Sequence, residues 1–130
     1  ILIDDSLVRG TTCHKIVKML YDAGAKEVHV RIACPEIKFP DFYGVDMPTK
    51  EELLANNKNN KEICEYINAK SLKFLSLGGI YKALGHEKRN DEFPQYSDHY
   101  FTGDYPIKPL DKVEEGKVMQ LSLLSGKSNI

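Results

Sequence analysis

Residues 1–33 combine an apolar run, a helical pattern and a second apolar pattern, and this order constrains the fold more than any other feature. Ile1 to Ile3 form an uninterrupted apolar stretch, typical of a strand buried on both faces of a parallel sheet. Residues 12–23 carry apolar side chains at helical spacing, Gly24 is suited to end that helix, and Lys26 to Ala33 alternates as a strand. Such a βαβ unit is right-handed, so we predict an α/β fold with a Rossmann-like parallel sheet.

Two acids, Asp4 and Asp5, follow the first apolar run at the point where the predicted strand ends. Ligands of open α/β sheets bind beyond the carboxyl ends of the strands, so acids at this position are expected to face a ligand. Ionised carboxylates accept hydrogen bonds only, which suits vicinal hydroxyl groups or a hydrated divalent cation. The pair therefore indicates a sugar diol.

The loop from Ser6 to Thr12 supplies hydroxyl groups, one guanidinium group and a glycine, and it runs directly into the predicted helix. A glycine-containing loop at a helix N-terminus presents unpaired N–H groups to an anion, and the helix dipole adds to the attraction. The implied ligand is a sugar phosphate. Taken singly, a solvated acidic pair and an ordinary N-cap at Thr11 or Thr12 are the simpler interpretations, but the combined order of residues favours a ligand site.

Three stretches of the chain resemble a known enzyme family. The first twelve residues, ILIDDSLVRGTT, resemble the phosphoribosyl-diphosphate-binding motif of type I phosphoribosyltransferases, in the version found in the glutamine amidophosphoribosyltransferases. Residues 23–53, AGAKEVHVRIACPEIKFPDFYGVDMPTKEEL, and residues 101–107, FTGDYPI, also resemble that family. The resemblance implies the C-terminal part of a type I phosphoribosyltransferase domain. The implied reaction is the first committed step of purine synthesis, in which glutamine-derived ammonia displaces pyrophosphate from phosphoribosyl diphosphate (PRPP).

Matching the motif residue by residue implies a role for each member of the loop. Asp4 and Asp5 would contact the 2- and 3-hydroxyls of the ribose, with Mg²⁺ held mainly by the diphosphate and hydroxyl oxygens and the two acids as direct or indirect metal ligands. The 5-phosphate would be bound by the remainder of the loop: Ser6, Arg9, Gly10, Thr11 and Thr12. No residue is assigned as a nucleophile or general base.

The resemblance also implies what surrounds this chain. It begins without methionine, inside a predicted strand, and is expected to be a fragment that is inactive alone. An N-terminal glutaminase domain and the first half of the transferase domain would lie upstream, in an enzyme expected to be a homo-oligomer. Residues 1–85 would be the C-terminal half of the phosphoribosyltransferase domain, and residues 86–130 a polar loop and C-terminal tail. Two rival functions stay open: a salvage phosphoribosyltransferase, and a non-catalytic regulatory module that binds sugar phosphates.

Composition narrows the class of protein. The chain has 130 residues, 42% of them hydrophobic, and a net charge of −1, the make-up of one soluble globular domain without the basic excess of a nucleic-acid-binding protein. No apolar run approaches the roughly 20 residues of a membrane span, and no signal peptide is evident, so we expect a cytoplasmic protein. The three cysteines show no C-x-x-C pair or metal-ligand spacing, and we expect reduced thiols.

Several residues outside the motif could carry chemistry, and for each the simpler interpretation is preferred. Cys13 lies on the apolar stripe of the predicted helix and is expected in the core, although a helix N-terminus can activate a thiol. His29 and Arg31 are expected to be solvated, and the Asp98–His99 pair, without a nucleophile nearby, is expected at the surface.

The resemblance bears on an iron–sulfur cluster as well. Many members of the family ligate a cluster through cysteines just before their F-Y-G and F-T-G sequences. Here Asp41 precedes Phe42, and Ser97 and Tyr100 stand in the second region, so we predict that no cluster is bound.

The remaining segments are expected to build the scaffold. Residues 34–49 would form an ordered loop, rich in proline and aromatic residues, that either walls the site or packs on itself. A capping box at residues 49–52 precedes a short helix, and a second helix, a strand at 71–76 and a helix at 77–84 stopped by Gly85 follow. Residues 118–124 would form a short docking helix or strand, and Gly126-Lys127-Ser128, which lacks the first glycine of a P-loop, a polar tail.

Overall fold

The computed structural model describes residues 1–44 and 49–107. The predictions for residues 118–124 and 126–128 lie outside these described residues. The described elements follow the chain in this order: β1 (Leu2–Asp4), α1 (Thr11–Asp22), β2 (His29–Ile32), the 3₁₀ turn η1 (Lys50–Glu52), α2 (Leu54–Asn57), α3 (Asn60–Tyr66), β3 (Ser71–Phe74), α4 (Leu77–Ala83) and α5 (His99–Thr102). No helix in this described part is long and apolar enough to cross a membrane.

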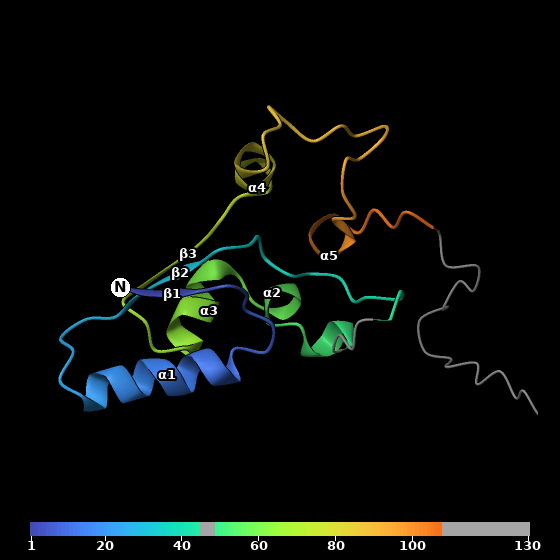
Figure 1. The fold of residues 1–130 in the computed structure, drawn as a ribbon. Helices are drawn as coiled ribbons and strands as arrows, with labels where there is room; N and C mark the ends of the chain where they lie inside the picture. The colour runs from blue at the N-terminus through green and yellow to red at the C-terminus, as the bar shows by residue number, and fades with distance from the viewer. Residues whose placement is uncertain (45–48, 108–130) are drawn as a thin grey trace, which may run out of the picture.

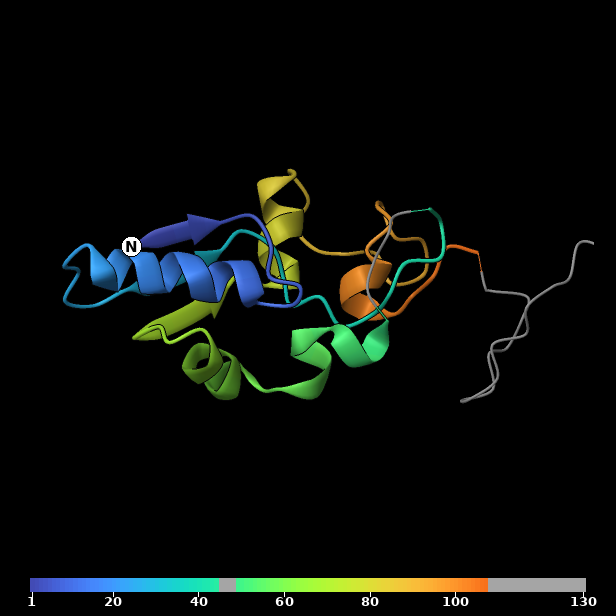
Figure 2. The ribbon, with the colours of Figure 1, turned by 90° about the horizontal axis from the view of Figure 1, so that it is seen from below.

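The three strands form one parallel sheet in the order β1-β2-β3, which confirms the predicted α/β class and the parallel pairing. Asp4 pairs with Ile32, and Ile32 pairs with Phe74, so the three strands end at the same edge of the sheet. Figures 1 and 2 show the β1–α1 connection, α2, α4 and α5 beyond this carboxyl edge. Any ligand bound there faces loops from all three strands.

The hydrophobic core lies between the sheet and the helices α1 and α3, which cover one of its faces (Figures 1 and 2). Helix α1 contributes Cys13 and Val17, as its apolar spacing predicts. The sheet contributes Val30, Ile32 and Leu72, and α3 contributes Ile63 with the following Ile67. Each aliphatic side chain buried in this way stabilises the fold by about 1.5–3 kcal/mol. The same core holds α1 against this face of the sheet.

The opposite face of the sheet is exposed in the described residues, so the expected burial of the first strand on both faces is not seen in this part of the protein. Ile3 was expected to be buried, but it is 73% exposed, and Ile1 is 89% exposed. Ile3 shares this face with Arg31 and Lys73, its partners across the register. Strand β1 is at the sheet edge, and no helix of the described residues covers this face (Figure 1). Within residues 1–44 and 49–107, burial of the sheet is therefore confined to the face toward α1 and α3.

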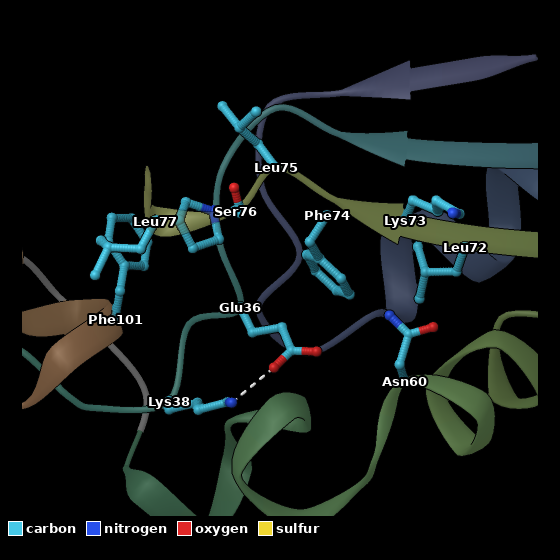
Figure 3. A pocket seen from close by; sticks show the side chains of 11 residues that line it. Glu36, Lys38, Asn60, Leu72, Lys73, Phe74, Leu75, Ser76, Leu77 and Phe101 are labelled. Carbon is cyan, nitrogen blue, oxygen red and sulfur yellow. Dashed lines mark ion pairs between the residues drawn. The ribbon is translucent and has the colours of Figure 1, made fainter. Parts of the chain in front are cut away.

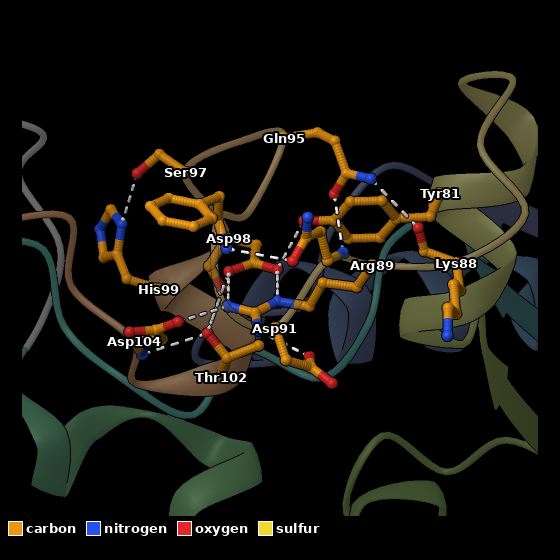
Figure 4. Close-up of polar contacts among 12 residues, drawn as sticks. Tyr81, Lys88, Arg89, Asp91, Gln95, Ser97, Asp98, His99, Thr102 and Asp104 are labelled. Carbon is orange, nitrogen blue, oxygen red and sulfur yellow. Dashed lines mark hydrogen bonds and ion pairs between the residues drawn. The ribbon is translucent and has the colours of Figure 1, made fainter.

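The segment after α4 contains a polar cluster centred on Arg89 (Figure 4). Its guanidinium binds both carboxylate oxygens of Asp98, at 2.6 and 3.1 Å, and also Asp91 and Asp104. Tyr81 of α4 donates to Asp98 at 2.8 Å. Burial works against the Asp98 carboxylate, but hydrogen bonds from Arg89 and Tyr81 outweigh it and lower the pKa of Asp98. This cluster ties the polar segment to α4.

The expected surface location of Asp98 and His99 is also wrong. Both are buried, with exposed fractions of 4% and 2%. They do not pair with each other: Asp98 binds Arg89, whereas His99 donates from Nε2 to Asp41 at 2.8 Å. His99 also packs against the ring of Tyr105, with ring centroids 5.0 Å apart. Their burial could not be read from the sequence, because the residues that bind them, Arg89 and Asp41, lie elsewhere in the chain.

Candidate functional site

The loop between β1 and α1 encloses a cavity of about 320 Å³ lined by residues 4–13. All seven residues predicted to bind a sugar phosphate line this cavity: Asp4, Asp5, Ser6, Arg9, Gly10, Thr11 and Thr12. Two backbone hydrogen bonds fix the loop. At its start, Ala33 N donates to Asp4 O at 2.9 Å. Further along, Leu54 N donates to Val8 O at 3.0 Å. The sheet and α2 thus hold the two ends of one short loop.

Helix α1 begins without a side-chain cap. Its N-cap is Gly10, with φ 74°, and no side-chain hydrogen bond caps the first turn. The alternative that Thr11 or Thr12 is an ordinary N-cap is therefore wrong, since Thr11 is already the first helical residue and both hydroxyl-bearing side chains are exposed. The N–H groups of this first turn and the positive end of the helix dipole face the cavity loop, an arrangement that attracts anions.

Gly10 is required by the geometry in two ways. Its positive φ lies in the left-handed region that L side chains rarely adopt. A Cβ at this position would also lie 2.7 Å from Leu54 Cδ2 and 3.0 Å from Tyr66 Cε1. Helices α2 and α3 therefore press directly against the last residue of the loop, and only glycine fits there.

The two acids keep acceptor capacity for a ligand. Asp4 Oδ1 accepts from Asp5 N at 3.0 Å, and Asp5 Oδ1 accepts from the Ser6 hydroxyl at 3.0 Å. The Oδ2 atom of each carboxylate has no hydrogen-bond partner among the described residues, and neither acid forms an ion pair there. Asp5 is exposed and Asp4 half-buried, and both residues line the cavity at the strand end.

Two thiols lie close to this acidic pair. Cys13 is 2% exposed, which confirms its expected place in the core. Burial, followed by the nearby Asp4 carboxylate, raises the pKa of the Cys13 thiol. Burial and then Asp5 likewise raise the pKa of Cys34, which follows β2. The raised pKa values favour the protonated form of both thiols at neutral pH, which argues against either as a nucleophile.

Arg9, which lines the cavity, forms an ion pair with Glu52 of η1. Its Nε donates to Glu52 Oε1 at 3.3 Å, and the two side chains are 54% and 49% exposed. Sequence reasoning assigned Arg9 to the phosphate but missed Glu52, which lies 43 residues later in the chain. The only signal for Glu52 was its place in the capping box with Thr49, which the structure confirms.

A second cavity, of about 490 Å³, lies at the carboxyl end of β3, between α5 and the segment that follows β2 (Figure 3). The Glu36–Lys38 ion pair, at 2.7 Å, and the ring of Phe74 line it. None of the predicted site residues lies there. Its position beyond the ends of β2 and β3 is the one sequence signal that could have indicated it.

The described part of the proline-rich loop after β2, residues 34–44, packs against the segment around α5. None of residues 34–44 lines the cavity at the loop of β1, and the rings of Phe42 and Tyr43 contact Tyr105 and His99. Asp41, Ser97 and Tyr100 gather around His99, whose Nδ1 lies 2.9 Å from Ser97 Oγ. The absence of an iron–sulfur cluster stays a prediction.

Comparison with known proteins places this geometry in context. No family model matches the chain. The chain is 55% identical over 126 residues to an amidophosphoribosyltransferase of Rhizobium etli, an alignment that covers 96% of this chain and 25% of that protein. It is 49% identical over 117 residues to amidophosphoribosyltransferase 2, chloroplastic, of Arabidopsis thaliana, covering 89% of this chain and 20% of the plant protein.

A solved structure agrees with the sequence relatives. The glutamine phosphoribosylpyrophosphate (PRPP) amidotransferase from B. subtilis, complexed with ADP and GMP, matches 80% of this chain and 23% of its own with a TM-score of 0.71 and 46% identity. The chain is homologous to a segment of the amidophosphoribosyltransferases. It spans 20–25% of the length of the two curated amidophosphoribosyltransferases above. Its parallel sheet is thus part of the type I phosphoribosyltransferase fold of these enzymes.

Proposed function

We propose that this chain is the PRPP-binding segment of an amidophosphoribosyltransferase, which forms 5-phosphoribosylamine from PRPP and glutamine-derived ammonia at the start of purine synthesis. One observation carries the proposal: the acids Asp4 and Asp5 and the uncapped N-terminus of α1 line the same cavity of about 320 Å³. The homology favours this enzyme over a salvage phosphoribosyltransferase. The glutaminase domain and the remaining binding groups would belong to the complete enzyme.

The ribose phosphate would span the loop from the strand end to the helix. Asp4 and Asp5 would accept hydrogen bonds from the 2- and 3-hydroxyls, for which their free Oδ2 atoms are suited. Gly10, Thr11 and Thr12 would offer backbone N–H groups and hydroxyls to the 5-phosphate, assisted by the helix dipole. Arg9 and Ser6 would complete the anion site from its rim. Each group of the sugar phosphate then meets a partner of matching hydrogen-bond character.

The residues at the strand end also fit Mg²⁺ bound together with PRPP. No set of three or more acidic, histidine or cysteine side chains among residues 1–44 and 49–107 could hold a metal alone. Asp4 and Asp5 offer two carboxylate oxygens, and Mg²⁺ commonly binds through one or two carboxylates plus substrate phosphates and water. The bound ion would neutralise charge on the leaving diphosphate. The two acids would hold it directly or through water.

The proposed chemistry needs no protein nucleophile. As pyrophosphate leaves, positive charge builds on the ribose ring, and the adjacent Asp4 and Asp5 carboxylates would stabilise it. The loop, braced by the sheet and by α2, would hold the sugar in the orientation that the attacking ammonia requires. Positioning and electrostatics would thus supply the catalysis. The thiols of Cys13 and Cys34, whose pKa values are raised, would take no part.

The test replaces both acids with asparagine in the complete enzyme that carries this segment. We expect phosphoribosylamine synthesis to fall at least about a hundredfold, the usual effect of removing transition-state electrostatics. Glutamine hydrolysis should persist, because the glutaminase site lies elsewhere. Asp22→Asn, an exposed acid at the far end of α1 that pairs with Lys18, is the control and should leave synthesis unchanged. Synthesis at the wild-type rate in the double variant would refute the assignment.

A further inference from the structure

The turn at residues 49–54 braces the loop of the proposed PRPP site, although it lies some forty residues later in the chain. Leu54 N donates to Val8 O at 3.0 Å, which fixes the backbone of the loop. The Leu54 side chain also packs against Gly10, where an added Cβ would lie only 2.7 Å from Leu54 Cδ2. The conformation of the loop therefore depends on where this turn sits.

Glu52 connects the turn to the loop through both of its carboxylate oxygens. Oε2 accepts from Thr49 N at 3.2 Å, closing the capping box that starts η1. Oε1 accepts from Arg9 Nε at 3.3 Å. The capping box fixes the carboxylate, and the carboxylate in turn fixes the guanidinium of Arg9.

This contact holds Arg9 by one edge only. Glu52 takes the Nε–H, while the two terminal amino groups of Arg9 have no partner among the described residues. A guanidinium held at Nε keeps its terminal N–H groups in a fixed plane, and these groups suit the paired oxygens of a phosphate. Glu52 therefore presents the binding groups of Arg9 at the rim of the cavity that Arg9 lines.

We propose that Glu52 is a positioning residue for PRPP, acting through Arg9 on the 5-phosphate. This inference rests on the proposed function. The positioning role predicts the opposite of what charge repulsion alone would give. A carboxylate near an anion site should repel the anion, so by repulsion alone the removal of Glu52 should tighten phosphate binding. If Glu52 instead positions Arg9, its removal weakens binding. Because the pair is half-exposed, the expected effect is small, roughly two- to fivefold.

The experiment compares four variants in the complete enzyme, measuring the dissociation constant of ribose 5-phosphate and the KM and kcat for PRPP. Glu52→Ala should raise the dissociation constant and KM roughly two- to fivefold, with kcat nearly unchanged. Glu52→Gln should restore both, because an amide oxygen accepts from Arg9 Nε and glutamine also suits a capping box. Glu51→Gln removes a neighbouring exposed charge and should have no effect. Thr49→Ala weakens the same turn without removing the Arg9 contact, so it separates lost stability from lost positioning.

A double-mutant cycle with Arg9→Ala completes the test. In the Arg9→Ala background, Glu52→Ala should cause no further loss of affinity, because its effect passes through Arg9. Tighter binding in Glu52→Ala, an equal loss in Glu52→Gln, or an additive loss in the double variant would each overturn the inference. If wild-type enzyme fails to bind ribose 5-phosphate or PRPP, the proposed function itself is wrong. Binding by wild type that is insensitive to Glu52 refutes the positioning role alone.

Discussion

Replacing Gly10 with alanine tests how the loop is built, because this substitution strains the loop in two separable ways. The backbone at φ 74° costs an L residue roughly 1–2 kcal/mol. The added Cβ, 2.7 Å from Leu54 Cδ2 and 3.0 Å from Tyr66 Cε1, forces these side chains to move. Overpacking of this kind costs about 1–3 kcal/mol.

Gly24→Ala is the matched control for the backbone term. Gly24 also has a positive φ, 97°, but a Cβ there would meet nothing within 4 Å. Gly10→Ala should therefore be about 1–3 kcal/mol less stable than Gly24→Ala, or roughly 4–12 °C lower in Tm by calorimetry. In a Leu54→Ala background the excess should shrink, because the methyl group that clashes is gone. Equal destabilisation by the two glycine substitutions would refute the close packing of the loop against α2.

Three further outcomes are expected from the charges and thiols. Asp98→Asn leaves the charge of Arg89 partly uncompensated and should lower the free energy of unfolding, measured with denaturant, by about 3–5 kcal/mol. The side chain of Asp91 is 89% exposed, so Asp91→Asn should lower it by less than about 1 kcal/mol. The folded state lowers the pKa of Asp98, so the stabilising contribution of this carboxylate is complete above its unfolded pKa of about 4. The contribution is lost as the pH falls through the folded pKa. The free energy of unfolding should therefore depend less on acid pH in Asp98→Asn than in wild type. Since the Asp5 carboxylate helps to raise the pKa of Cys34, Asp5→Asn should speed alkylation of Cys34 near pH 8, and an unchanged rate would remove Asp5 as a cause.

The sequence predicted those parts of the fold that depend on local patterns. The 3.6-residue spacing of α1, the alternation of β2 and the capping box at Thr49 all describe neighbours in the chain, and the structure confirms each. The exposure of Ile3 could not be read in the same way. An apolar strand has the same sequence at a sheet edge as in the middle, and only its neighbours decide which faces are dry.

The candidate site shows the same difference between local patterns and long-range contacts. Its seven predicted residues are consecutive or nearly so, and the structure brings them around one cavity. The contacts that shape that cavity come from far along the chain: Glu52 to Arg9 spans 43 residues. His99 shows the same limit, since its partner Asp41 lies 58 residues away while its sequence neighbour Asp98 binds Arg89 instead. Long-range pairs of this kind leave no periodic signal in a single sequence.

The most direct test of the proposed site is a crystal structure of the complete enzyme with ribose 5-phosphate and Mg²⁺. The 5-phosphate should lie about 3 Å from the backbone N–H groups of Gly10 to Thr12, with the 2- and 3-hydroxyls against the carboxylates of Asp4 and Asp5. A sugar phosphate bound instead in the cavity between β3 and α5, with the loop of β1 empty, would contradict the account.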